Sequence, residues 1–335
     1  MMRSSRLTTK RCSSVLSFVL AATLLLATSA CGLLGGDTDE SSGPRPKVAA
    51  TLMTILDSAP LRWAIDQGYF RAAGIEVTPV PAESGQAGIA KLQGGDADIA
   101  YAGDVAIISA VATGGLDLRV IAQAAMAGPE TMWIMVRNDG SVPTVADLAG
   151  KRIAHNGVNG VSHMLTRAVM ATHKVDDSTV QWTRANFPDI PGLLARKEID
   201  AALLPEPYIM AANKQQLKPL IDPIKGGGFE QSIPTGSYVV TAAWAQQHPA
   251  EIAAFQRALR RAAAEVTSKP EIVQQLAVRE MKVDAGDAQL MKLPIFPLKP
   301  SAVQLQRWAD LMHSFGVIKQ PVRMSDLVIA PPPDQ

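Results

Sequence analysis

Three serines of the sequence stand at the expected starts of helices, directly after expected strands: Ser58, Ser84 and Ser162. A hydroxyl at such a position, with the unpaired backbone N–H groups of the helix start, can hydrogen-bond the polar atoms of a small ligand. Gly85 extends the second of these starts. The pattern is typical of reversible binding, although each serine taken singly is equally consistent with a helix cap.

A glycine-rich turn precedes the third of these helix starts. It covers residues 156–160 and includes Asn159 and Gly160. Glycines here would let the backbone approach a ligand more closely than a side chain allows, and they are also ordinary turn residues. His163 follows Ser162 and can donate to a ligand, but a single histidine is more often structural.

Two acids occupy matching positions in an internal near-repeat. Leu92, Asp96, Asp98 and Ala100 recur 102 residues later as Leu194, Glu198, Asp200 and Ala202. At the same offset, Asp104 corresponds to Glu206. Each of these two acids follows the carboxyl end of an expected strand, where open α/β sheets place their ligands. Each also begins an expected helix, whose dipole alone would stabilise it by about 0.3–1 kcal/mol.

The sequence offers little support for an enzyme. It contains no P-loop, and residues 160–164 lack the second glycine of a nucleophile elbow. The five histidines show no metal-ligand spacing with carboxylates or thiols. We therefore expect a protein that is not an enzyme, with no catalytic residue, no metal and no cofactor.

The hydrophobic pattern alternates expected strands and helices. Strands are predicted at residues 48–56, 75–80 and 97–101, and helices at residues 59–70, 85–93 and 105–112. The same alternation resumes after residue 145. Short turns between such units indicate an α/β protein with parallel sheets covered on both faces.

The first residues are typical of an export signal. Four basic residues and no acid precede an apolar run at residues 15–27, and small residues then lead to Cys31. We expect residues 1–30 to be a lipoprotein signal peptide and Cys31 to be lipidated, so that the protein is exported and anchored on the outer face of the cell membrane. The alternative is an ordinary secretory signal. Residues 31–46, rich in Gly, Ser, Asp and Pro, predict a flexible tether.

Length and charge limit the function further. Without residues 1–30 the count of 32 Lys and Arg against 31 Asp and Glu becomes 28 against 31. A mildly acidic chain without a basic stripe is a poor nucleic-acid binder, so we expect no nucleic-acid partner. The remaining length predicts two lobes rather than one.

Several segments together resemble a known family. They are residues 57–60, 67–70, 73–77, 92–100, 147–154, 206–208 and 315–318. In order and spacing they resemble the solute-binding proteins of ABC importers for nitrate, sulfonate, taurine and thiamine-precursor pyrimidines. The resemblance covers residues 48–328.

This resemblance implies a periplasmic-binding-protein type II fold, with two Rossmann-like lobes joined by crossing strands. Lobe 1 would comprise residues 47–130 and 236–330, and lobe 2 residues 131–235. The crossing strands would lie at residues 131–137 and 236–241.

The resemblance also implies that the solute is held between the two lobes. It places Asp57, at the first helix start, and the loop containing Phe187 and Asp189 at the cleft. Phe187 could stack on a flat ligand or pack in the core, and Tyr208, behind Glu206, has the same two interpretations.

The implied function is that of a monomeric receptor that carries a small polar solute to the permease and ATPase subunits of an importer. One alternative is an extracytoplasmic sensor subunit, and another is a lyase or synthase on the same fold. If Asp104 and Glu206 face the cleft, they oppose a bare anion such as nitrate. A taurine-like or pyrimidine-like solute would suit them better.

Overall fold

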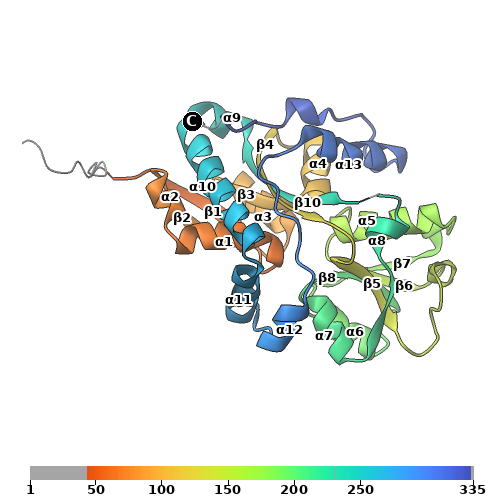
Figure 1. Cartoon of the computed structure of the whole chain (residues 1–335). Helices are drawn as coiled ribbons and strands as arrows, with labels where there is room; N and C mark the ends of the chain where they lie inside the picture. The colour runs from red at the N-terminus through yellow and green to blue at the C-terminus, as the bar shows by residue number, and fades with distance from the viewer. Residues whose placement is uncertain (1–43, 230, 333–335) are drawn as a thin grey trace, which may run out of the picture. The chain divides into compact units, whose positions relative to one another are not determined.

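The computed structural model describes residues 44–229 and 231–332, so the expected signal peptide, Cys31 and most of the tether lie outside the described residues. Strands and helices alternate over most of residues 47–226, as predicted, and residues 242–326 form helices only (Figure 1). The first elements are β1 (Lys47–Leu52), the 3-10 turn η1 (Leu56–Ser58), α1 (Ala59–Asp66), α2 (Tyr69–Ala72), β2 (Glu76–Pro81), α3 (Gly85–Gly94), β3 (Ala100–Gly103), α4 (Asp104–Ala112) and β4 (Leu118–Ala127). The helix predicted over residues 59–70 is divided in two because Gly68 adopts a left-handed φ of 69°.

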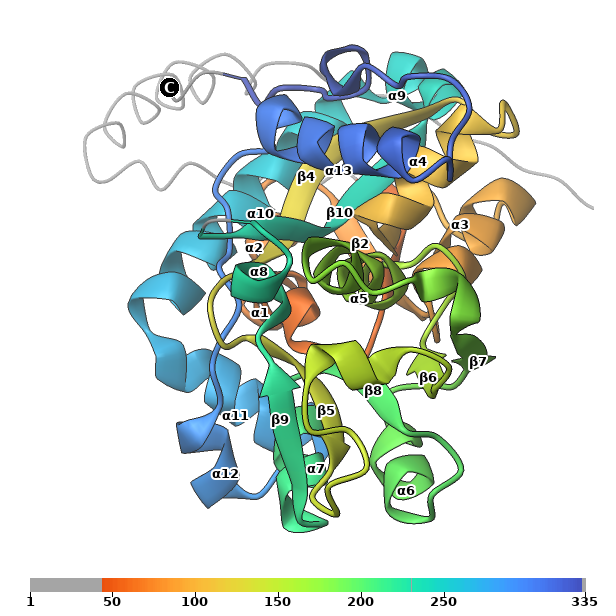
Figure 2. The same cartoon turned by 90° about the vertical axis from the view of Figure 1, so that its right-hand side faces the viewer.

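The middle of the chain forms one five-stranded sheet with the order β7-β6-β8-β5-β9. Its elements are β5 (Met132–Arg137), η2 (Val145–Leu148), β6 (Arg152–His155), α5 (Val161–Thr172), η3 (Asp177–Thr179), β7 (Gln181–Arg184), α6 (Ile190–Ala195), β8 (Ala201–Pro205), α7 (Tyr208–Lys214), β9 (Leu217–Ile221) and α8 (Pro223–Gly226). Ile134 and Leu203 pack with α5, and Met135 and Leu204 pack with α6 and α7. Alternate residues of each strand therefore serve the two helical layers that Figure 2 shows on either side of this sheet.

The chain then returns to the first strands through β10 (Ile233–Thr241). Its last elements are α9 (Ala242–Gln247), α10 (Pro249–Ser268), α11 (Pro270–Met281), α12 (Ala285–Leu290), α13 (Ala302–Ser314) and η4 (Met324–Asp326). Strand β10 lies between β3 and β4, and β1 pairs with β2. Helix α10 packs on α1 and α2, where Phe255 stacks on Phe70 with ring centroids 5.2 Å apart.

The prediction of parallel sheets is only partly correct. β1 and β2 are parallel, as are β6, β7 and β8, but β5 and β10 run antiparallel to their neighbours. These are the two strands expected as crossings, and the chain passes between the sheets immediately before each of them. A buried strand is apolar on both faces, so its hydrophobic pattern carries no information on its direction.

The internal near-repeat has a structural counterpart. The carboxylate of Asp98 accepts a hydrogen bond from the backbone N–H of Ala49 in β1 at 2.8 Å, and that of Asp200 accepts one from Arg152 in β6 at 3.0 Å. The two backbones also pair directly, since the N–H groups of Asp98 and Asp200 donate to the carbonyls of Ala49 and Arg152. The repeated acids thus fix equivalent strand pairs in the two parts of the chain.

Within the described residues, the search for a helix both long enough and apolar enough to span a membrane finds none.

Candidate functional site

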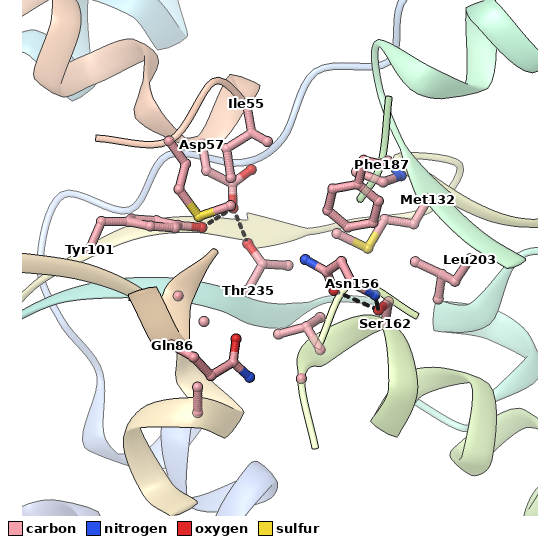
Figure 3. Close-up of a pocket in the computed structure, with 17 residues that line it drawn as sticks. Ile55, Asp57, Gln86, Tyr101, Met132, Asn156, Ser162, Phe187, Leu203 and Thr235 are labelled. Carbon is pink, nitrogen blue, oxygen red and sulfur yellow. Dashed lines mark hydrogen bonds between the residues drawn. The ribbon is translucent and has the colours of Figure 1, made fainter. Parts of the chain in front are cut away.

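An inner pocket lies between the first strands and the five-stranded sheet (Figure 3). Its empty volume is about 620 Å³, including part of its open mouth. One side is formed by Met53, Ile55, Asp57, Gly85, Gln86, Tyr101, Gly103, Ala106 and Thr235, and the other by Met132, Asn156, Gly160, Val161, Ser162, Phe187, Leu203 and Pro205. The pocket is therefore assembled from loops at the ends of strands in both parts of the chain, the usual position for ligands in open α/β sheets.

Asp57 is the acid of the inner pocket. Its Oδ2 accepts hydrogen bonds from the hydroxyl of Thr235 at 2.8 Å and from that of Tyr101 at 3.0 Å. Burial raises the pKa of the Asp57 carboxyl, and the two hydroxyl hydrogen bonds oppose that rise. Burial and the neighbouring Asp57 also hold the pKa of Tyr101 well above its usual value, so Tyr101 stays a donor.

The opposite side of the pocket is the start of α5. The hydroxyl of Ser162 donates to Oδ1 of Asn156 at 2.7 Å, and the backbone N–H of Asn156 donates to the same hydroxyl at 3.3 Å. This pair leaves the Asn156 amide nitrogen directed toward the pocket in Figure 3. With the N–H groups of the first helical turn at Val161, it forms a region rich in donors.

The start of α3 supplies a second helix end. Ser84 caps this helix by accepting the backbone N–H of Ala87 at 3.1 Å, so its hydroxyl is engaged within the protein. Gly85 lies against β3, and a Cβ there would stand 2.8 Å from the backbone nitrogen of Gly103. Glycine is required at this position because only its backbone fits between helix and strand. Among the described residues, no Lys or Arg lines this pocket.

The structure brings five of the predicted site residues together in the inner pocket: Asp57, Gly85, Gly160, Ser162 and Phe187. Phe187, Asp189 and Tyr208 line a wider outer chamber that adjoins it. The rings of Phe187 and Tyr208 stack with centroids 5.6 Å apart. Phe187 therefore lines both spaces, and the ring of Tyr208 packs against the ring of Phe187.

Asp104 and Glu206 line neither of these spaces. Asp104 is 1% exposed, and its Oδ1 accepts a hydrogen bond of 2.5 Å from Ser237 in β10. Burial raises the pKa of Asp104 to about 7. Glu206 lies behind the inner pocket, beside a small cavity that Lys292 also lines, and accepts the backbone N–H of Met210. Burial raises its pKa to about 7 as well.

Ser58, Asn159 and His163 line neither space, and they lie in or beside the loops that surround the inner pocket. Ser58 is buried beside α1. Asn159, with a left-handed φ of 51°, donates its backbone N–H to Nδ1 of His163 at 3.0 Å. His163 stacks on His155 with ring centroids 4.9 Å apart, and burial lowers its pKa to about 4. His163 is therefore a neutral acceptor that holds the turn before α5.

Sequence reasoning missed Tyr101, Thr235 and Gln86, and did not select Asn156 as a ligand contact. Tyr101 and Thr235 lie in buried strands, where the sequence signals packing only. No cluster of three or more His, Cys, Asp or Glu residues suited to a metal ion occurs in the described ranges.

The sequence matches the model of the family described as "NMT1/THI5 like" over residues 56–272. The chain belongs to this family. No curated protein has significant sequence similarity to it.

Several solved structures are similar to the chain. One is the alkanesulfonate-binding protein SsuA from Xanthomonas axonopodis pv. citri bound to MOPS, with a TM-score of 0.72, 19% identity and coverage of 86% of this chain and 99% of that one. Another is a Candida albicans gene product described as having the generic periplasmic binding protein fold, with a TM-score of 0.71, 16% identity and coverage of 87% and 98%. A third is the nitrate-binding protein NrtA from Synechocystis PCC 6803, with a TM-score of 0.62, 15% identity and coverage of 72% and 69%. These likenesses confirm the predicted α/β fold class of periplasmic binding proteins.

Proposed function

We propose that this family member is an exported solute-binding receptor of an ABC importer. It would capture a small polar solute between lobe 1 (residues 47–130 and 236–330) and lobe 2 (residues 131–235) and deliver it unchanged to a permease. The observation that carries the proposal is the inner pocket, whose lining comes from both proposed lobes and sets one buried acid opposite the start of α5.

The two sides of the pocket favour a dipolar solute. Asp57 offers acceptor oxygens and a potential negative charge, so it suits an amine or a ring N–H. Asn156 and the first turn of α5 offer donors, which suit a sulfonate, a carboxylate or a ring nitrogen. Taurine-like zwitterions and aminopyrimidines carry both kinds of group. The apolar walls, with Met132 and Leu203, leave room for an alkyl chain or a ring.

A bare anion fits this pocket less well. Nitrate would meet the Asp57 carboxylate in a site that has no lysine or arginine in its described lining, and an unpaired charge of the same sign there costs binding free energy. The nitrate-binding and alkanesulfonate-binding proteins named above share the fold. Between their two chemistries, the pocket favours a sulfonate that also carries an amine.

Capture would proceed by closure of the two lobes. Three hydrogen bonds at the pocket already join them. Besides the bond from Thr235 to Asp57, Tyr208 Oη donates to the carbonyl oxygen of Thr54 at 3.1 Å, and Gln86 Nε2 donates to that of Val158 at 3.4 Å. A solute that contacts both lobes stabilises the closed form more than the open form. The closed form would dock on the permease, and ATP hydrolysis in the partner subunits would drive release.

The anchor is proposed from the sequence. Acyl chains on Cys31 would hold the monomeric receptor at the outer face of the membrane, and the tether would let it sample the space around the permease. Incorporation of labelled palmitate into the wild-type chain, and its loss in Cys31→Ala, would support this part of the proposal. Equal labelling of both chains would refute it.

The function is tested by equilibrium binding to the purified full chain in detergent, in a phosphate buffer free of sulfonates. Taurine, ethanesulfonate, nitrate and the aminopyrimidine half of thiamine are titrated by calorimetry, and each bound compound is recovered and weighed by mass spectrometry. Saturable binding of taurine or of the aminopyrimidine, with unchanged mass, is the expected result. Binding of nitrate alone, or conversion of the bound compound, would contradict the proposal.

A further inference from the structure

The inner pocket adjoins a second space, which we call the outer chamber. The outer chamber has an empty volume of about 1320 Å³, including open solvent. It shares Met53, Ile55, Asn156 and Phe187 with the inner pocket. These four residues therefore lie at the boundary between the two spaces.

On the side of Tyr208, a contact between the two proposed lobes closes the wall of the outer chamber. Tyr208 stacks on Phe187 and donates its hydroxyl to the carbonyl oxygen of Thr54, which belongs to the opposite proposed lobe. The chamber thus persists where the two lobes already touch.

Three charged side chains line the outer chamber: Glu83, Lys91 and Asp189. Within residues 44–229 and 231–332 none of the three makes an ion pair or a side-chain hydrogen bond. Lys91 is half-buried, and the two acids are exposed. Such groups can exchange water for the polar atoms of a ligand at a small desolvation cost.

Apolar side chains, among them Leu52, Pro81 and the Phe187–Tyr208 pair, form much of the remaining chamber wall, and Thr54, Asn156 and Asn186 add neutral polar groups. A substituent placed here would rest its carbon skeleton on the apolar side chains and turn its polar atoms toward the charged ones. An unbranched alkyl chain would use only the first kind of contact. The lining therefore favours a substituent that carries hydroxyl, ether or charged groups.

On the basis of the proposed function, we infer that the solute has two parts: a small dipolar head in the inner pocket and a polar, hydrogen-bonding substituent in the outer chamber. An N-substituted taurine is one such compound, and an aminopyrimidine joined to a second ring is another. The head determines whether the solute binds, and the substituent determines how tightly.

Matched pairs of probes test this inference. Taurine is compared with its N-morpholino and N-tris(hydroxymethyl)methyl derivatives, and the aminopyrimidine half of thiamine with thiamine. Each is titrated into the purified full chain in phosphate buffer. The handful of heavy atoms added by the substituent should tighten Kd by about tenfold in at least one pair.

Two variants of α3 test whether the gain in affinity from the substituent arises in the outer chamber. Ala87 lines the outer chamber and not the inner pocket, so Ala87→Trp should place an indole ring where the substituent would lie and abolish the gain while the head-only probe keeps its Kd. Ala90 lies on the same helix, is exposed and lines neither space, so Ala90→Trp is the matched control and should keep the gain. Lys91→Met should reduce the gain for the hydroxylated taurine only in part.

The outcomes separate the two proposals. Binding of the head-only probes without any gain from a substituent would overturn this inference and leave the proposed function standing. A gain that survives Ala87→Trp, or an equal loss for head-only and substituted probes in that variant, would also overturn it. If none of the probes binds, the proposed solute class fails, and this inference fails with it.

Discussion

The hydroxyl of Tyr208 lies 3.1 Å from the backbone carbonyl oxygen of Thr54, a residue 154 positions earlier in the chain. Tyr208 begins α7, which packs on the five-stranded sheet, and Thr54 lies in the loop after β1. The contact therefore ties together the two parts of the chain that line the pocket. It also holds the ring that stacks on Phe187.

Tyr208→Phe tests this tie. The variant keeps the ring and its stacking on Phe187 but loses one hydrogen bond between the proposed lobes, worth about 0.5–1.5 kcal/mol. If ligand binding and closure are coupled, Kd for taurine or the aminopyrimidine should rise by about threefold to tenfold. Calorimetric titration measures the affinity, and small-angle scattering measures the closure.

The matched control is Tyr69→Phe. Tyr69 donates its hydroxyl to Glu265 on α10, away from both the inner pocket and the outer chamber. Its loss should lower the free energy of unfolding without changing Kd. An unchanged Kd in Tyr208→Phe, or an equal change in both variants, would show that Tyr208 does not stabilise the closed form.

Asp57→Asn should distinguish solutes by charge. Removing the carboxylate while keeping an oxygen acceptor for Tyr101 and Thr235 should weaken taurine binding by about tenfold to a hundredfold, because a hydrogen bond to a charged group contributes roughly 1.5–3 kcal/mol. Nitrate binding, if measurable, should improve, since the opposing charge is gone. Both are read by the same calorimetric titration.

The stability of Asp57→Asn serves as its internal control. Burial raises the pKa of Asp57, so the charged carboxylate opposes folding above its ordinary pKa, and the variant should unfold at an equal or higher urea concentration at neutral pH. Tighter taurine binding in the variant would rule out Asp57 as the partner of the amine.

Asp104 predicts a specific pH dependence of stability. Its pKa is about 7 in the folded protein against 3.8 ordinarily, so between these values the folded state binds one more proton than the unfolded state. This contribution to stability is complete below pH 3.8 and is lost as the pH rises to about 7. The stability of Asp104→Asn relative to wild type should therefore increase by up to about 1.4 kcal/mol per pH unit across this window.

Urea unfolding at several pH values measures the difference in unfolding free energy between Asp104→Asn and wild type. Glu206 and His163 are present in both proteins, so their titration cancels in this difference. Asp200→Asn is the control of opposite sign. Burial alone would raise the pKa of Asp200, but hydrogen bonds from Arg152 and Arg137 outweigh burial and lower it. The loss in Asp200→Asn should be nearly constant above about pH 5. A constant difference for Asp104→Asn as well would mean that Asp104 is not protonated in the folded protein.

Much of the fold could be predicted from the sequence because its signals are local. Apolar periodicity indicated the βα units, and the repeat of Asp98 at Asp200 marked two acids that bind equivalent strands. Strand direction could not be predicted, because β5 and β10 are buried on both faces and the burial pattern of such a strand is the same whichever way it runs. The division of the predicted helix at Gly68 depends on a left-handed residue that the hydrophobic pattern does not reveal.

The site was only partly predictable for a related reason. Helix starts after strands indicated Gly85, Gly160 and Ser162, whose roles follow from backbone geometry. The same rule also selected Asp104, whose side chain turns into the interior toward Ser237 and not into the pocket. Thr235, which donates to Asp57, lies 178 positions from it, and no local pattern predicts that pair.

Gly236→Ala should uncouple Tyr101 from Asp57. The ring of Tyr101 in β3 lies against the backbone of Gly236 in β10, and a Cβ there would stand 2.6 Å from Cζ of that ring. The ring must then move, which costs about 1–3 kcal/mol of stability and withdraws its hydroxyl from Asp57. We expect a lower urea midpoint and a Kd for taurine raised by about tenfold.

Two further variants separate packing from binding in this prediction. Tyr101→Phe keeps the ring in place and removes only the hydroxyl, so it should reproduce the loss of affinity with a smaller loss of stability. Gly286→Ala, on α12 with no heavy atom within 4 Å of the added Cβ, should leave Kd unchanged and stability equal or slightly higher. If Tyr101→Phe binds taurine as the wild type does, the hydroxyl of Tyr101 does not orient Asp57 for the solute, and the loss in Gly236→Ala is one of packing alone.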